Sequence, residues 1–212
     1  MDNYTSCQNI IQEKIYTKSK ELFLRNGIRN VTMEDIAKEL GISKKTIYQF
    51  VENKADLVLK SVHYDIDSIE KDTLNICSNS ENAVDEMLKI GYYIAVCLDK
   101  FSPGRLSELE KFYPESWQLV EKHQNGFVIH LIQENLKKGI EQNLYRKEID
   151  LEKISLFYIN GSNFVLTLGE RFPEKKMDFP QYFRAFLEYH LRAILTDIGL
   201  KHFINFSYDK TT

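Results

Sequence analysis

The chain has 212 residues, of which 43% are hydrophobic and 28% are charged, and its formal net charge at pH 7 is −3. With only four prolines and nine glycines, this composition excludes fibrous and disordered chains and is typical of a globular, helix-rich protein. No apolar run approaches the roughly 18 residues of a membrane helix, and the N-terminal MDNYTSCQNI does not resemble a signal peptide. The sequence therefore predicts a cytoplasmic protein with no membrane partner.

Cysteine spacing and charge distribution narrow the function classes further. The three cysteines, Cys7, Cys77 and Cys97, form no CxxC pair, so we expect neither a disulfide framework nor a zinc site. Residues 8–54 carry nine basic and six acidic side chains, so this segment is positive while the rest of the chain is negative. A basic end on an acidic body indicates an anionic partner at that end, although a solvated face is the simpler alternative.

The N-terminal segment has the periodicity and caps of short helices. Apolar residues recur at helical spacing almost throughout the chain, so we expect an all-α fold. A first helix should end at Gly27, because glycine readily adopts the left-handed turn that closes helices. Thr32 with Asp35 three residues later predicts a capping box at the start of a second helix.

The stretch GISKKTIYQF at residues 41–50 predicts a sharp corner between two helices. Gly41 breaks the second helix and Ser43 caps a third. The third helix should turn Ile47, with Phe50 or Val51, inward, and its other side should present Lys44, Lys45, Tyr48 and Gln49. This is the layout of a helix-turn-helix, whose second helix enters the major groove of DNA. Asn53 and Lys54 then open a fourth helix, whose N-terminus suits a phosphate.

The remaining two thirds of the chain should be helical as well. We expect helices at about residues 82–101, between the Pro103-Gly104 turn and Pro114, and at about 115–142, 151–170 and 181–198. Asp150 should cap the fourth of these. The last two carry apolar stripes that would form a four-helix dimer interface with their symmetry mates, in which Gly161 allows close approach. Packing within one chain is the alternative.

These features resemble the TetR family of bacterial transcriptional regulators, most specifically over residues 8–57. The positions that fit the family pattern are Gly41, Ile42, Ser43, Thr46, Ile47, Tyr48, Asn53, Lys54, Asp56 and Leu57. Val51 stands where the family usually has Phe, and Ala55 stands where an acid is common. After residue 58 the resemblance is one of helix order and length.

The resemblance implies an all-α homodimer with two domains in each chain. Residues 1–54 would form the helix-turn-helix DNA-binding domain, and residues 55–212 a helical domain for dimerisation and ligand binding. The dimer would bind a palindromic double-stranded DNA operator, and a small-molecule effector would release it. On this interpretation the protein is a ligand-responsive regulator, which we expect to be a repressor; an activator is the alternative that the sequence leaves open.

The resemblance and the positions of these residues together predict the DNA contacts. Phosphate contacts are expected from Lys44, Tyr48 and Lys54, helped by the hydroxyls of Thr32, Ser43 and Thr46. Base edges would be read by Lys44, Lys45 and Gln49, because Lys suits guanine and Gln suits adenine. The alternative is a polar helix face used for protein contacts.

Aromatic side chains and a few polar groups in the later helices are candidates for an effector pocket. An apolar or aromatic small molecule would be held by Tyr93, Cys97, Phe101, Trp117, Phe127, His130, Asn160 and Phe164. Ordinary core packing of these residues is the alternative. His123 and His130 lie about 10 Å apart on one helix, too far for one ion, so no metal is expected.

Two other classes of function compete with a DNA-binding regulator. A relative that kept the fold could bind only proteins, although it would have no physical need for Lys44, Tyr48 and Lys54. A helical enzyme is disfavoured because the sequence has no HExxH, P-loop, GxSxG or Rossmann glycine motif. Glu108 and Glu110 are interpreted as solvated charges. We therefore expect no enzymatic activity and no cofactor.

Overall fold

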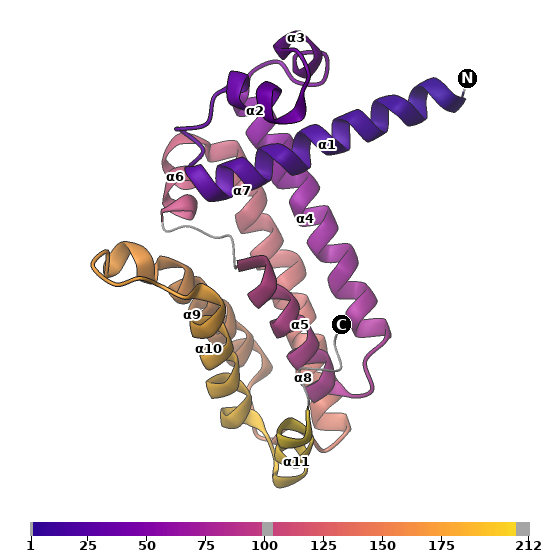
Figure 1. The fold of residues 1–212 in the computed structure, drawn as a ribbon. Coiled ribbons are helices and arrows are strands. Elements are labelled where there is room, and N and C mark those ends of the chain that lie inside the picture. The colour runs from indigo at the N-terminus through magenta and orange to yellow at the C-terminus, as the bar shows by residue number, and fades with distance from the viewer. Residues whose placement is uncertain (1, 99–103, 207–212) are drawn as a thin grey trace. The chain divides into compact units, whose positions relative to one another are not determined.

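A computed structural model describes residues 2–98 and 104–206 of the chain, with side chains from residue 8 onward (Figure 1). Its regular elements are helical throughout these residues, which confirms the predicted all-α fold. The α-helices are α1 (Asp2–Asn26), α2 (Met33–Leu40), α3 (Lys44–Ile47), α4 (Lys54–Ser78), α5 (Ala83–Cys97), α6 (Arg105–Phe112), α7 (Pro114–His123), α8 (Ile129–Glu141), α9 (Leu151–Arg171), α10 (Phe179–Ile194) and α11 (Asp197–Asn205). Among the described residues, no helix combines the length and apolar character needed to cross a membrane.

The helices group into two units by packing. The first unit contains residues up to 69 and residues 104–121 of the described chain, and the second contains residues 70–98 and 122–206. Helices α4 and α7 therefore each begin in the first unit and end in the second. The domain boundary predicted at residue 54 remains a prediction, since grouping by packing does not test it.

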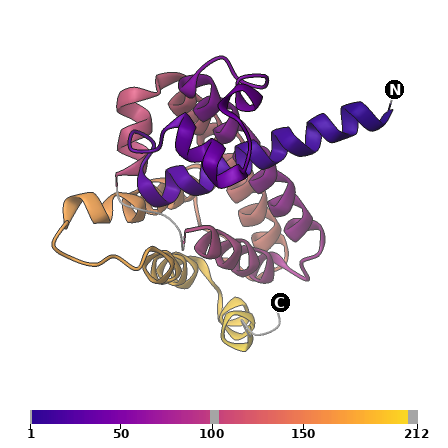
Figure 2. The ribbon, with the colours of Figure 1, turned by 45° about the horizontal axis from the view of Figure 1, so that its top comes forward.

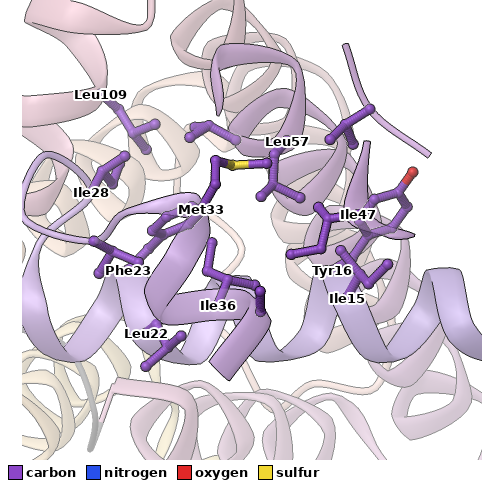
Figure 3. Close-up of a cluster of buried hydrophobic side chains, with 14 residues drawn as sticks. Ile15, Tyr16, Leu22, Phe23, Ile28, Met33, Ile36, Ile47, Leu57 and Leu109 are labelled. Atoms are coloured by element: carbon purple, nitrogen blue, oxygen red, sulfur yellow. The ribbon is translucent and has the colours of Figure 1, made fainter. Parts of the chain in front are cut away.

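The core of the first unit is built from one stripe of each of its helices. In Figure 3, Ile15 and Phe23 of α1 face Ile36 of α2, Ile47 of α3 and Leu57 of α4. Ile15, Ile36, Ile47 and Leu57 are each 0% exposed. Burying such side chains stabilises a fold by about 1.5–3 kcal/mol each, so this core holds the short helices α2 and α3, which could not persist alone.

The second unit is built around a bundle of four helices. Contacts join α5 to α8, α8 to α9, α9 to α10 and α10 back to α5, so these helices close into a ring (Figures 1 and 2). The centre of the ring is filled by buried apolar side chains, among them Met87, Leu88, Ile132, Leu136, Leu187 and Leu191. The segment before α8, Gln124–Val128, is π-helical, a feature often found at functional sites.

The structure corrects the prediction of a single last helix at residues 181–198. Helix α10 ends at Ile194, Leu195 is extended and pairs with Tyr145, and Thr196 caps the separate helix α11. The Arg146 N–H donates to the Ile194 carbonyl at 2.9 Å. This pairing with a distant segment gives the chain alternative backbone hydrogen bonds, which end the helix.

The close approach expected at Gly161 is made within the chain. A side chain at this position would collide with the ring of Phe186 on α10. Gly161 therefore lets α9 and α10 of one chain pack together. The prediction that it faces a symmetry mate was wrong, because the periodicity of α9 does not distinguish a neighbour in the chain from one in a partner.

Candidate nucleic-acid interface

Helix α2 begins at a capping box, as the sequence predicted. The Asp35 N–H donates to the Thr32 hydroxyl oxygen at 3.1 Å, and the Thr32 N–H donates to the Asp35 carboxylate at 2.8 Å. Hydrogen bonds from the Thr32 hydroxyl and backbone hold the pKa of Asp35 below its ordinary value. Thr32 itself is exposed beside this helix N-terminus, where the helix dipole favours an anion.

The corner between α2 and α3 depends on Gly41. Its φ of 64° lies in the left-handed region, and its N–H donates to the carbonyls of Ala37 and Lys38. Ser43 then caps α3, since its hydroxyl oxygen accepts from the Thr46 N–H at 3.1 Å. The Ser43 and Thr46 hydroxyls are 2.9 Å apart. Both predicted turns are confirmed, and they fix the direction of α3.

Helix α3 presents one polar face and buries the other. Ile47 of α3 is 0% exposed and Val51, four residues later, is 3% exposed, so the apolar side of this segment is docked on the core. On the opposite side, Lys44 and Lys45 of α3 and Tyr48 and Gln49 of the turn that follows it are exposed. Val51 therefore packs inward in place of the larger Phe that the resemblance led us to expect.

Two predicted phosphate contacts already have partners within the chain. The Lys44 ammonium lies 3.2 Å from the Glu34 carboxylate on α2, but both side chains are largely exposed, so this pair is weak. Lys54, the first residue of α4, is half-buried and donates to the Arg29 carbonyl at 3.2 Å. Desolvation lowers the pKa of Lys54. One bond to Arg29 leaves two of the three ammonium N–H donors for a phosphate.

The candidates for effector binding are spread over both units. Trp117 packs against the core of the first unit, and the other seven belong to the second unit or, for Phe101, lie outside the described residues. Tyr93 and Cys97 are one turn apart on α5, and the Tyr93 hydroxyl donates to Asp72 at 2.8 Å. Desolvation, the Asp72 carboxylate and Cys97 together raise the pKa of Tyr93 well above its usual range.

Four further candidates sit on the second unit near its surface. The ring of Phe127 is stacked on His123, with centroids 5.5 Å apart. His130 and Asn160 are exposed, and Phe164 is 48% exposed. Exposure of this kind suits contact with a large partner better than the wall of an enclosed pocket, so the ligand-binding roles of these residues stay predictions.

Comparison with known proteins decides the family. Residues 15–60 match the sequence profile of the bacterial regulatory proteins, tetR family. The HTH-type transcriptional regulator YfiR of Bacillus subtilis is 23% identical over 175 residues, covering 79% of this chain and 83% of YfiR. A TetR-family transcriptional regulator from Agrobacterium tumefaciens has a TM-score of 0.73 at 15% identity, covering 89% of this chain and all of that one. The chain belongs to the TetR family.

A second solved structure extends the likeness in fold. FadR of Bacillus subtilis, solved in complex with stearoyl-CoA, has a TM-score of 0.62 at 17% identity, covering 84% of this chain and 96% of FadR. The profile match over residues 15–60 spans the helix-turn-helix described above and marks it as the DNA-binding domain of a transcriptional regulator.

One residue of this TetR-family protein was misinterpreted from its sequence. Glu108 on α6 is not a solvated charge, since only 13% of its side chain is exposed and it is paired with Arg105. Its carboxylate accepts from the backbone N–H groups of Ile28 and Arg29, about eighty residues earlier in the chain. No local pattern signals such a contact, so sequence reasoning had no means to find it.

Proposed function

We propose that this TetR-family protein is a ligand-responsive repressor that binds a palindromic operator as a homodimer. The observation that carries the proposal is the division of α3 into a buried apolar side, anchored by Ile47, and an exposed side of hydrogen-bond donors. A docked helix with free donors can enter a major groove without unfolding. A dimer does so twice, at half-sites about 34 to 36 Å apart.

The proposed DNA contacts fall into two classes. Lys44, Tyr48 and Lys54, with the hydroxyls of Thr32, Ser43 and Thr46, contact phosphates, which set affinity and salt dependence. Lys45 and Gln49, with Lys44, contact base edges, which set the sequence preference. Substituting Lys54→Met should therefore weaken binding to all duplexes and reduce the salt slope by about 1. Gln49→Ala should instead change which sequence is preferred.

The proposed dimer interface lies on α9 and α10. These neighbouring helices carry large exposed apolar side chains, namely Leu156, Phe157, Phe164, Tyr182 and Tyr189. Monomeric proteins rarely expose large contiguous apolar patches, so side chains of this kind on two neighbouring helices support an interface here. A two-fold axis would bring each patch onto its own copy. The inward residues Phe183, Leu187 and Leu191 are already buried within the chain, so the interface uses the outer faces.

The proposed effector is an apolar or aromatic small molecule bound by the helical domain of residues 55–212. Support comes from the aromatic content of the second unit and from the π-helical segment that contains Phe127. FadR, a structural relative, was solved with stearoyl-CoA, a ligand with a long apolar chain. Effector binding acts by preferring the conformation that does not bind DNA. A Trp117 fluorescence screen with measured DNA release tests this part.

The decisive experiment is selection of bound sequences from a random duplex library at physiological salt. We expect an enriched palindrome, followed by a steep fall in affinity with salt on the selected site. Transcription in vitro from a promoter that contains the site should then fall when the protein is added. A library without enrichment would overturn operator binding, and a promoter that is stimulated would overturn repression.

A further inference from the structure

The loop between α1 and α2 is held by a carboxylate from α6. One Glu108 oxygen accepts from the Arg29 N–H at 2.7 Å, and the other accepts from the Ile28 N–H at 3.0 Å. Hydrogen bonds to an ionised carboxylate are about twice as strong as neutral ones. Both N–H groups lie just outside the helices, so no helical carbonyl is available to them. Glu108 thus fixes the backbone of this loop at two successive residues.

Arg105 holds the Glu108 carboxylate in place. The guanidinium lies 3.1 Å from the carboxylate, and its Nε donates to the Leu24 carbonyl at the end of α1 at 3.2 Å. Only 16% of the Arg105 side chain and 13% of the Glu108 side chain are exposed. Each charge therefore has its ion-pair partner within the protein, and removing either one leaves the other half-buried without that partner.

The same loop holds Lys54, the first residue of α4. Arg29 gives its N–H to Glu108 and its carbonyl to the Lys54 ammonium, at 3.2 Å. The Arg29 guanidinium lies 4.4 Å from the centre of the Phe112 ring, at the other end of α6. Arg29 thus connects α6 to the ammonium of Lys54, the first residue of α4. A displaced Arg29 carbonyl would move the Lys54 ammonium with it.

We propose that Glu108 is a positioning residue for DNA binding, which fixes the α1–α2 loop so that Arg29 aims the Lys54 ammonium at a DNA phosphate. The proposal rests on the proposed phosphate contact of Lys54. It assigns a role in DNA binding to α6, a helix outside the helix-turn-helix. The loop that Glu108 holds also leads directly into Thr32, the cap of α2.

The sign of the effect separates this role from simple electrostatics. Glu108→Gln removes a negative charge close to the DNA-binding residues, so electrostatics alone predicts tighter binding to the polyanion. Positioning predicts the opposite, a loss of roughly tenfold in affinity and a salt slope that is smaller by about 1. Glu110→Gln is the matched control, because Glu110 is exposed on the same helix and carries the same charge. It should leave DNA affinity unchanged or slightly higher.

A double variant identifies the route of the effect. If Glu108 acts through Lys54, Glu108→Gln should cost little further affinity in a Lys54→Met background, since contacting residues are not additive. Affinities are measured for the full chain on one selected duplex at several salt concentrations. Circular dichroism at the same temperature verifies that each variant is folded. Should Glu108→Gln fail to fold, Phe112→Leu, which removes the aromatic support of Arg29, tests the same route.

The outcomes distinguish this inference from the proposed function. Affinity equal to or higher than wild type in Glu108→Gln overturns the positioning role, as does a full additional loss in the Lys54→Met background. A wild-type chain that binds no duplex overturns the proposed operator binding instead. Wild-type binding that Lys54→Met leaves unaltered overturns the phosphate contact, and with it the inference.

Discussion

Replacing Phe157 by Asp should separate the proposed dimer into monomers. Phe157 is 67% exposed on α9, more than most large apolar side chains of the described chain. In a two-fold interface, the Phe157 side chain of each chain would be buried against α9 and α10 of the partner. An Asp there would place two carboxylates in an apolar contact, where each has lost its hydration.

The size of the effect follows from the exposed area. A Phe side chain buries about 200 Å² when fully covered, and the 67% that is now exposed corresponds to roughly 130 Å². At about 25 cal/mol per Å², burying one Phe157 side chain contributes ~3 kcal/mol to the free energy of dimerisation. The two-fold symmetry buries two such side chains and doubles this contribution. Since area converts only in part to affinity, we expect a loss of at least ~3 kcal/mol, or more than a hundredfold in the dimer Kd.

Sedimentation velocity over a dilution series measures this change directly. Wild type should sediment as a dimer at concentrations where Phe157→Asp sediments as a monomer. Leu74→Asp is the control, because Leu74 is 52% exposed on α4, outside the proposed interface. The monomeric variant should also bind a full palindrome no better than a half-site. Equal dimer Kd values for wild type and Phe157→Asp would refute the proposed interface.

Two further predictions concern the stability of the second unit, and urea unfolding measures both. Burial lowers the pKa of His190 to about 4 from its ordinary 6.5, so on acidification the unfolded chain takes up the proton first. Between neutral pH and about pH 5 the free energy of unfolding should therefore fall by ~2 kcal/mol more in wild type than in His190→Leu; equal losses would contradict this. Gly139→Ala should cost ~1–3 kcal/mol, because its methyl group would collide with Tyr145. Gly126→Ala, where nothing lies nearby, should be neutral or stabilising, and equal effects at the two positions would refute the packing argument.

Much of the fold could be predicted because its signals are local. The capping box of Thr32 and Asp35, the left-handed Gly41 and the Ser43 cap each involve groups within four residues of one another. Asp150 likewise caps α9 by accepting from the Lys153 N–H at 3.1 Å. Backbone geometry and hydrogen-bonding groups are written into such short stretches. The exposed polar face of α3 follows from the same periodicity.

Predictions failed where a contact spans a long stretch of chain. The end of α10 is decided by pairing with the segment around Tyr145, and the packing of Gly161 by Phe186. Glu108 looks solvated in sequence, but in the structure it is half-buried and paired with Arg105. In each case the helical pattern is correct, but it does not specify which element covers a given face.

The sequence by itself determined that this chain is helical, where its DNA-binding helices turn, and which side of α3 is polar, because helix caps and periodicity depend on near neighbours. Only the tertiary structure decided which apolar faces are buried within the chain and which stay exposed. It alone brought Glu108 to the backbone of Ile28 and Arg29, and Arg29 to Lys54. Such contacts arise from the packing of whole helices, since no short stretch contains both partners.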